Sequence, residues 1–319
     1  MSSHTINHTS KRYVNDNARV AEVREAAHAK LQGRKRFYDT VTIANINDVE
    51  GMKEDARVVV SSGVDGGEGG LKLGKGLEEE DEVYEDWYTI LLDGRKLRTP
   101  AKRGLVIPSR KLAEAVRNEW DYQVDYVEPS SMPLTSLCYT AIDQVAGEKE
   151  WTRGNVIRYL RNDTLCYWVG MEDEGRVIRR MQEDRWGKVI EWVKSEDGLG
   201  EDPYIETGIG GRGGLKHPEE LVLKAENMLK DMDLWELTAM QSLTMETKSC
   251  LLGLACMSTA VTVEEACKAG RVEEDFNIEQ WGLVEGGHDF DILNNRIGVR
   301  AACMFVEWIR EGRGGGEVK

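Results

Sequence analysis

The chain has 319 residues, with 42 Lys and Arg against 57 Asp and Glu, a formal net charge of −15 and a mean hydropathy of −0.49. This length is enough for two ordinary domains, so folding needs neither a disulfide nor a metal. No run of about 18 apolar residues occurs, which excludes a membrane-spanning helix. The negative charge opposes general binding to nucleic acid or to an anionic membrane surface.

The distribution of cysteines and charges gives information on the cellular compartment of the protein. None of the six cysteines forms a CxxC pair, and free cysteines within apolar patterns favour a reducing compartment. Residues 1–46 carry eight basic and four acidic side chains, and the first fifteen residues contain no acid. We therefore expect residues 1–35 to be an N-terminal tail that is compatible with an organelle transit peptide or its remnant. A disordered tail is the alternative.

The first part of the chain predicts a small sheet. Residues 37–46 and 87–92 are rich in β-branched and aromatic side chains, which favour strands. The pair Asp93-Gly94 predicts a tight hairpin turn, from which residues 96–99 return as a strand. Residues 105–107 are expected to add an edge strand.

Helices and an insertion complete this first region. Ser109 is a plausible N-cap for one helix and Pro133 a first residue for the next, each followed by an apolar stripe. From about residue 50 to 83 the chain is glycine-rich and acidic, with too few apolar groups to offset the entropy of ordering. We expect a disordered insertion there, within an α+β domain over residues 36–148.

From residue 149 to the end the pattern predicts a helical bundle domain, interrupted by a glycine-rich loop over about 195–217. Pro218 and Asp233 are candidate helix starts, and Thr262 begins a capping box with Glu265. The expected helices cover residues 151–169, 176–194, the segments after Pro218 and after Asp233 (the latter through Leu254), the segment after Thr262, and residues 273–283 and 289–310.

A search for reactive groups finds little. Residues 208–213 match GxGxxG, but the strand before and the helix after that a dinucleotide site requires are missing, so a linker is the better interpretation. No histidine has a second His or a Cys at metal-ligand spacing. His288 beside Asp289 could be a base with its orienting carboxylate, although a helix-capping Asp beside a surface His explains the pair more simply. Any of the nine tryptophans left exposed would be an interface anchor.

Several strings, taken together, resemble one known family. They are residues 36–38, 92–100, 119–123, 132–135, 141–143, 163–167, 247–249 and 274–289, which include Trp281-Gly282, Val284-Glu285 and His288-Asp289. In this order they are similar to the ATP12-type assembly chaperones of the catalytic head of mitochondrial ATP synthase, the type that binds the alpha subunit.

The resemblance implies a small α+β domain followed by a helical domain, in agreement with the patterns above. It implies a chaperone of the mitochondrial matrix, not an enzyme, that needs no cofactor. It would bind the unassembled alpha subunit and shield its subunit interface until the beta subunit replaces it. We expect a monomer that binds neither nucleic acid nor membrane.

Candidate client-binding residues are Glu274, Glu285 and Asp289 in the last string, and Arg95 and Arg98 in the hairpin. Acidic groups on a helical face could pair with client Arg or Lys side chains. Capping and solvation explain them equally well. Two other functions stay open: a soluble enzyme that uses His288 with a neighbouring carboxylate, and a structural scaffold.

Overall fold

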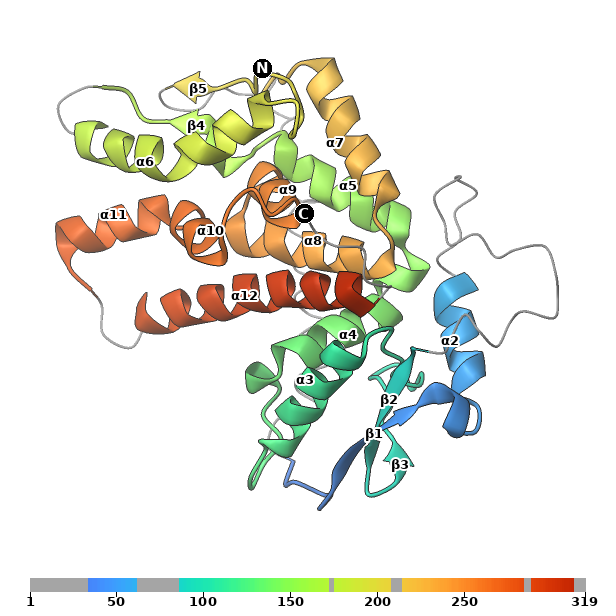
Figure 1. Ribbon diagram of the computed structural model, residues 1–319. Coiled ribbons are helices and arrows are strands. Elements are labelled where there is room, and N and C mark those ends of the chain that lie inside the picture. Colours follow the sequence, from blue (N-terminus) through green and yellow to red (C-terminus); the bar gives the residue numbers. More distant parts are fainter. Residues whose placement is uncertain (1–33, 62–85, 172–174, 208–213, 284–287, 313–319) are drawn as a thin grey trace, which may run out of the picture.

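The computed structural model describes residues 34–61, 86–171, 175–207, 214–283 and 288–312 (Figure 1). A small sheet with its helices lies at one end of the molecule, and a larger group of helices lies at the other. The expected α+β class is confirmed. Within the described residues, no helix is both long and apolar enough to cross a membrane.

The sheet has three antiparallel strands in the order β1-β2-β3. They are β1 (Val41–Asn45), β2 (Tyr88–Leu92) and β3 (Arg95–Lys96). Asp93 and Gly94 have φ angles of 48° and 74°. The predicted tight turn requires a positive φ at both of its central residues, so this prediction is confirmed. Residues 105–107, expected to be an edge strand, instead form an isolated bridge in which Ile107 pairs with Tyr88.

The insertion that we expected to be disordered from about residue 50 begins with an ordered helix. After a 3-10 turn (Ile46–Asp48), helix α2 spans Met52–Ser61. Met52, Ala56 and Val59 recur at helical spacing and are almost fully buried, so this short apolar face offsets the ordering of its backbone. The glycine-rich stretch over 62–85 lies outside the described residues.

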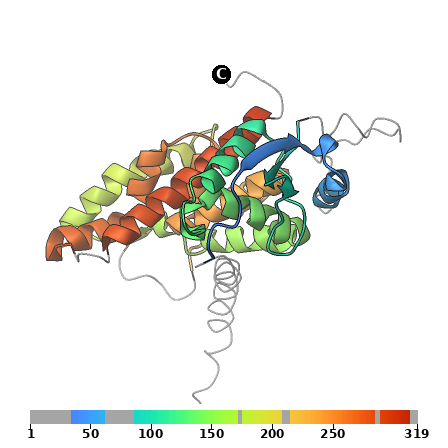
Figure 2. The same cartoon turned by 90° about the horizontal axis from the view of Figure 1, so that it is seen from below.

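Helix α3 (Arg110–Asp121) packs on the sheet, and α4 (Pro133–Asp143) packs on α3. Helix α3 is capped by Ser109, whose hydroxyl accepts from the amide of Leu112. After a 3-10 turn (Pro129–Ser131), α4 begins at the proline as predicted. Figure 2 shows α3 between β1 and the C-terminal part of helix α12 (His288–Gly312).

The remaining elements are mostly helical. After a 3-10 turn (Val145–Gly147) they are α5 (Lys149–Leu160), a 3-10 turn (Thr164–Cys166), β4 (Tyr167–Trp168), α6 (Gly175–Lys194), β5 (Glu206–Thr207), α7 (Glu219–Asp231), α8 (Leu234–Thr247), α9 (Cys250–Met257), α10 (Val263–Ala269), α11 (Val272–Trp281) and α12 (His288–Gly312). Strands β4 and β5 form a separate parallel pair.

Two expected helices are shorter in the structure. The helix expected over 151–169 ends at Leu160, because Asp163 caps a 3-10 turn and the chain then pairs with β5. The helix expected to run from Asp233 through Leu254 breaks at Lys248, which has a φ of 56°. Ser249 then caps α9 as a new helix. Both breaks depend on residues distant in the sequence.

Helix α12 joins the two regions. It packs on α8 and also contacts α3 and α4. Trp235 on α8 packs edge-to-face with Trp87 beside the sheet, at a ring-centroid distance of 6.4 Å, and contacts Phe305 on α12 in a tilted arrangement at 6.0 Å. The buried apolar residues form one continuous cluster. The division into domains at residue 148 therefore stays a prediction, and this shared core lies across it.

Candidate protein-docking surface

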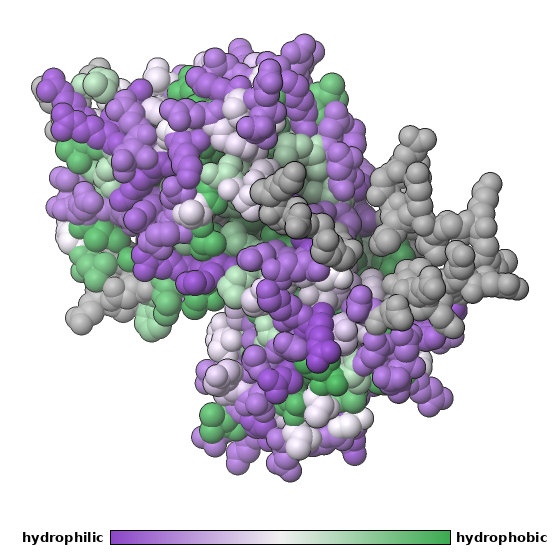
Figure 3. Space-filling view, in the orientation of Figure 1, coloured by the Kyte–Doolittle hydropathy of each residue, from purple (hydrophilic) through white to green (hydrophobic). Residues whose placement is uncertain are grey.

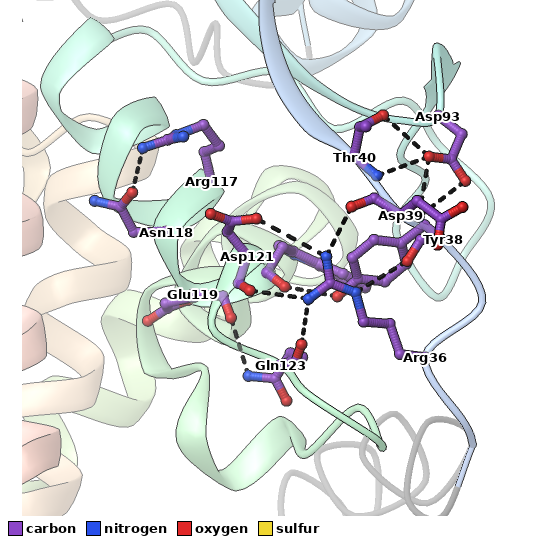
Figure 4. A network of polar contacts seen from close by, with 11 residues as sticks. Arg36, Tyr38, Asp39, Thr40, Asp93, Arg117, Asn118, Glu119, Asp121 and Gln123 are labelled. Carbon is purple, nitrogen blue, oxygen red and sulfur yellow. Dashed lines mark hydrogen bonds and ion pairs between the residues drawn. The ribbon is translucent and has the colours of Figure 1, made fainter.

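The polar residues of the family strings hold the fold together. The Arg36 guanidinium donates to the main-chain oxygens of Tyr38 at 2.9 Å, Asp39 at 3.0 Å and Asp121 at 3.0 Å, and to that of Gln123 (Figure 4). This side chain ties the strand entry to the end of α3. Its role in the described structure is to position the backbone.

Glu119 plays a similar part between α3 and α4. Its carboxylate accepts from the amide of Leu134 at 2.8 Å and from the amide and hydroxyl of Thr135, each at 2.7 Å. It therefore caps the N-terminus of α4 from a neighbouring helix. Burial raises the pKa of Glu119 to about 7, although these hydrogen bonds act in the opposite direction.

Two further acids of the strings hold distant segments. Asp143 accepts from the hydroxyl of Thr99 at 2.7 Å and from the amide of Ala101 at 2.9 Å, which fixes the hairpin to α4. Fully buried Asp163 accepts from the amide of Leu251 at 2.9 Å and so caps α9. These carboxylates therefore have a structural role in holding the described segments together.

The predicted client-binding residues do not form one cluster. Arg95 and Arg98 are exposed on the hairpin, where Arg98 donates to the main-chain oxygen of Lys102 at 2.7 Å. Glu274 lies on α11, at the opposite end of the molecule from β3 (Figure 1). Glu285 lies outside the described residues, and Asp289 is placed only as the second residue of α12.

Glu274 already has a partner within the molecule. Its carboxylate lies 2.5 Å from the Lys248 ammonium at the junction of α8 and α9. Burial acts to raise the pKa of Glu274, but the hydrogen bond and charge of Lys248 outweigh it, so the pKa is lowered. The carboxylate is thus ionised at neutral pH and fixes α11 to the bundle.

The same end of the molecule carries exposed apolar side chains. Trp281 at the end of α11 is 79% exposed, and Phe290 on α12 is 62% exposed. Leu283, Leu293 and Ile297 are also exposed. We call these five residues the α11–α12 surface. Figure 3 shows hydrophobic residues gathered at this end, beside atoms drawn in grey.

The exposure follows from the length of α12. Its C-terminal half buries Val299, Ala302 and Phe305 against α8 and its neighbours. Its N-terminal half extends past the end of α8 (Figure 1). Phe290, Leu293 and Ile297 follow one another by three and four residues and so lie on one helical face. Clustered apolar side chains on a rigid helix mark a protein-interaction surface.

Sequence reasoning found part of this surface. Trp281 belongs to a family string, and an exposed tryptophan was expected to be an anchor. Phe290, Leu293 and Ile297 were missed, because their helical spacing is also that of a buried face. No local signal in the sequence separates these residues from the buried ones, because both halves of α12 have the same helical spacing.

The described part of the chain also shows whether metal-binding groups are present. Among the described residues, no group of three His, Cys, Asp or Glu side chains could hold a metal ion. The GxGxxG match at 208–213 lies outside the described residues, and so does the side chain of His288. The enzyme alternative therefore stays an untested prediction.

Comparisons with known proteins agree with a chaperone. The family model described as "ATP12 chaperone protein" matches residues 76–194. The protein "ATP12, mitochondrial" of Saccharomyces cerevisiae is 23% identical over 260 residues, which are 70% of this chain and 79% of the yeast protein.

Two solved structures have a similar fold over most of this chain. The crystal structure of Atp12 from Paracoccus denitrificans has a TM-score of 0.64 and 25% identity, covering 86% of this chain and 98% of that one. The Atu1473 protein of Agrobacterium tumefaciens has a TM-score of 0.66 and 32% identity, with 86% and 85% covered. From its family match, its relatives and its fold, the chain belongs to the ATP12 chaperone family.

Proposed function

We propose that this protein is an assembly chaperone of ATP synthase that binds the unassembled alpha subunit and covers its subunit interface until the beta subunit takes its place. Membership of the ATP12 family supports the assembly role. The observation that carries the proposal is the α11–α12 surface, which presents large apolar side chains on anchored helices.

The physical logic is competition for one interface. A free alpha subunit exposes a surface meant for its neighbour, and exposed apolar patches aggregate. Trp281 and Phe290 supply large contact areas with few rotatable bonds, which is the composition of an interface hot spot. The beta subunit can displace the chaperone by binding the same surface, so release needs no reaction catalysed by the chaperone.

Charged residues complete the proposed contact. Glu285 precedes α12 in the sequence and Asp289 is the second residue of that helix, so we assign both to a polar rim that pairs with client Arg or Lys side chains. Glu274 supports this rim through its pairing with Lys248. Arg95 and Arg98 lie at the other end of the molecule, and we assign them to a secondary, salt-sensitive contact.

The proposed setting is the mitochondrial matrix, with the chaperone acting as a monomer without a cofactor. The yeast relative is named as mitochondrial, while two structural relatives are bacterial. The proposed role therefore requires only that the chaperone and the unassembled alpha subunit share a compartment.

The test is co-purification of the alpha subunit with the full chain. A Phe290→Asp/Leu293→Asp variant should lose the alpha subunit. Leu223→Asp should retain it, because Leu223 is similarly exposed, at 54%, but lies on α7. Added beta subunit should release alpha from the wild-type chain. Retention of alpha by the double variant would contradict the proposed surface, and failure of the wild type to bind alpha would contradict the proposed function.

A further inference from the structure

Helix α11 is attached to the bundle with little apolar burial. Of its ten residues only Val272 is buried and belongs to the continuous apolar cluster. Phe276 and Ile278 are partly exposed, and Trp281 is 79% exposed. Elements with few buried apolar contacts open at a lower free-energy cost than the core. The position of α11 beside α6 (Figure 1) therefore depends on other interactions.

A charged contact with α6 holds the first half of α11. The Arg185 guanidinium on α6 lies 2.6 Å from the Asp275 carboxylate and donates to the main-chain oxygen of Lys268 at 3.3 Å. Arg271 adds a longer contact to Asp275, at 3.7 Å. The side chains of Arg185 and Asp275 are only 18% and 28% exposed, so solvent ions screen this pair less than one on the open surface.

A second ion pair holds α11 from another direction. Lys248 lies at the junction of α8 and α9, and its ammonium is 2.5 Å from the Glu274 carboxylate. Glu274 and Asp275 are consecutive, so their side chains leave the helix about 100° apart. They therefore reach two different elements of the bundle. Attachment in two directions fixes the rotation of α11 about its axis as well as its place.

The consequence lies at the other end of the helix. Trp281 is the last residue of α11, and it follows Asp275 by six residues, or about 9 Å along the axis. Gly282, with a φ of 86°, then ends the helix. A rotation of α11 at its ion pairs is therefore transmitted to the Trp281 ring, which belongs to the α11–α12 surface.

We propose that Arg185 and Lys248 are positioning residues for client docking, which hold α11 through Asp275 and Glu274 and so set the orientation of Trp281. Neither cation belongs to the α11–α12 surface. The role in docking rests on the proposed function, whereas the attachment of α11 does not. Salt favours the local opening of α11, because it screens both ion pairs.

Hydrogen exchange of the full chain, followed by mass spectrometry, tests the attachment. In Arg185→Gln/Lys248→Gln we expect the amides of residues 276–282 to exchange several-fold faster than in the wild type, while α8 and α9 keep their protection. Lys188→Gln/Lys224→Gln is the matched control. It also removes two cations, but their ion pairs, of 2.9 and 3.0 Å, hold α10 and the chain after α6.

Salt and a charge exchange separate ion pairing from a general structural role. Wild-type exchange over residues 276–282 should rise several-fold between low salt and about 1 M NaCl, where the Debye length is about 3 Å. This salt effect should be lost in Arg185→Gln/Lys248→Gln. Lys248→Glu/Glu274→Lys should regain protection that Lys248→Glu alone loses. Equal exchange in Arg185→Gln/Lys248→Gln and its control would overturn the proposal.

Binding of the alpha subunit is measured separately. Arg185→Gln/Lys248→Gln should bind it several-fold more weakly than the control variant, with a urea midpoint of the whole chain no lower than that of the control. Faster exchange without weaker binding would overturn the positioning role. Failure of the wild-type chain to bind the alpha subunit would instead contradict the proposed function, and the exchange data would still decide whether the ion pairs attach α11.

Discussion

Asp163 and Leu251 are 88 residues apart in the sequence, yet the Asp163 carboxylate accepts a hydrogen bond from the Leu251 amide at 2.9 Å. The same carboxylate accepts from the Leu165 amide at 3.1 Å. One side chain thus caps both the 3-10 turn after α5 and the first turn of α9. It ends one predicted helix and starts another.

Asp163→Asn should destabilise the protein by about 2 kcal/mol or more, because an amide NH2 would face backbone donors in a fully buried site. Burial raises the pKa of Asp163 to about 6, so the carboxylate is ionised at pH 7 and accepts these bonds as a charged group. Urea denaturation measures the change. Asn162→Ala, at the exposed neighbouring position, is the control, and an equal loss in both variants would contradict the capping role.

The stability of the protein should depend on pH through Glu119. Its folded-state pKa is about 7, above the ordinary value of 4.5, so between these values the folded state binds a proton that the unfolded state does not. Unfolding free energy therefore rises as pH falls from about 7 to about 4.5, by up to about 1.4 kcal/mol per pH unit.

Glu119→Gln removes that titration and is the matching variant. The wild-type unfolding free energy minus that of Glu119→Gln should increase as pH falls through the window between pH 7 and 4.5. Urea denaturation at several pH values gives this difference. If it stayed constant, Glu119 would have an ordinary pKa in the folded state.

Substitution of two phenylalanines on α12 should distinguish an effect on stability from an effect on alpha-subunit binding. Phe305 is fully buried, so Phe305→Ala should cost about 3–5 kcal/mol of unfolding free energy. Phe290 is 62% exposed, so Phe290→Ala should change stability by no more than about 0.5 kcal/mol. It should nevertheless weaken alpha-subunit binding, as measured by titration calorimetry. Loss of stability in Phe290→Ala would show that this residue is part of the core.

Both capping boxes can be tested by removing the cap. Asp233 accepts from the amides of Trp235 and Glu236 at the start of α8, and Thr262 accepts from the amide of Glu265 at the start of α10. Replacing either residue by Ala should cost about 1 kcal/mol. The comparison is by thermal denaturation with Thr259→Ala, a position outside both caps, as the control for Thr262. A cost of zero in both caps would show that the amides are satisfied by water.

Local signals were sufficient where the interacting residues are close in the sequence. The Asp93-Gly94 turn, the Ser109 cap, the proline starts and the Thr262 box each satisfy a nearby backbone group, so their identity and spacing determined the element. The failures lie where a distant partner decides. Helix α2 is ordered because Met52 is buried. After the break at Lys248, the carboxylate of Asp163 caps the next helix by accepting from the amide of Leu251.

The sequence by itself therefore determined the α+β class, most helices and the family, because helical periodicity, caps and turns depend on short-range geometry. Tertiary structure alone decided which apolar stripes are covered. Phe290 and Phe305 have the same side chain on the same helix, and only the end of α8 leaves one in solvent and the other in the core. Burial depends on what packs against a residue, and that neighbour is remote in the chain.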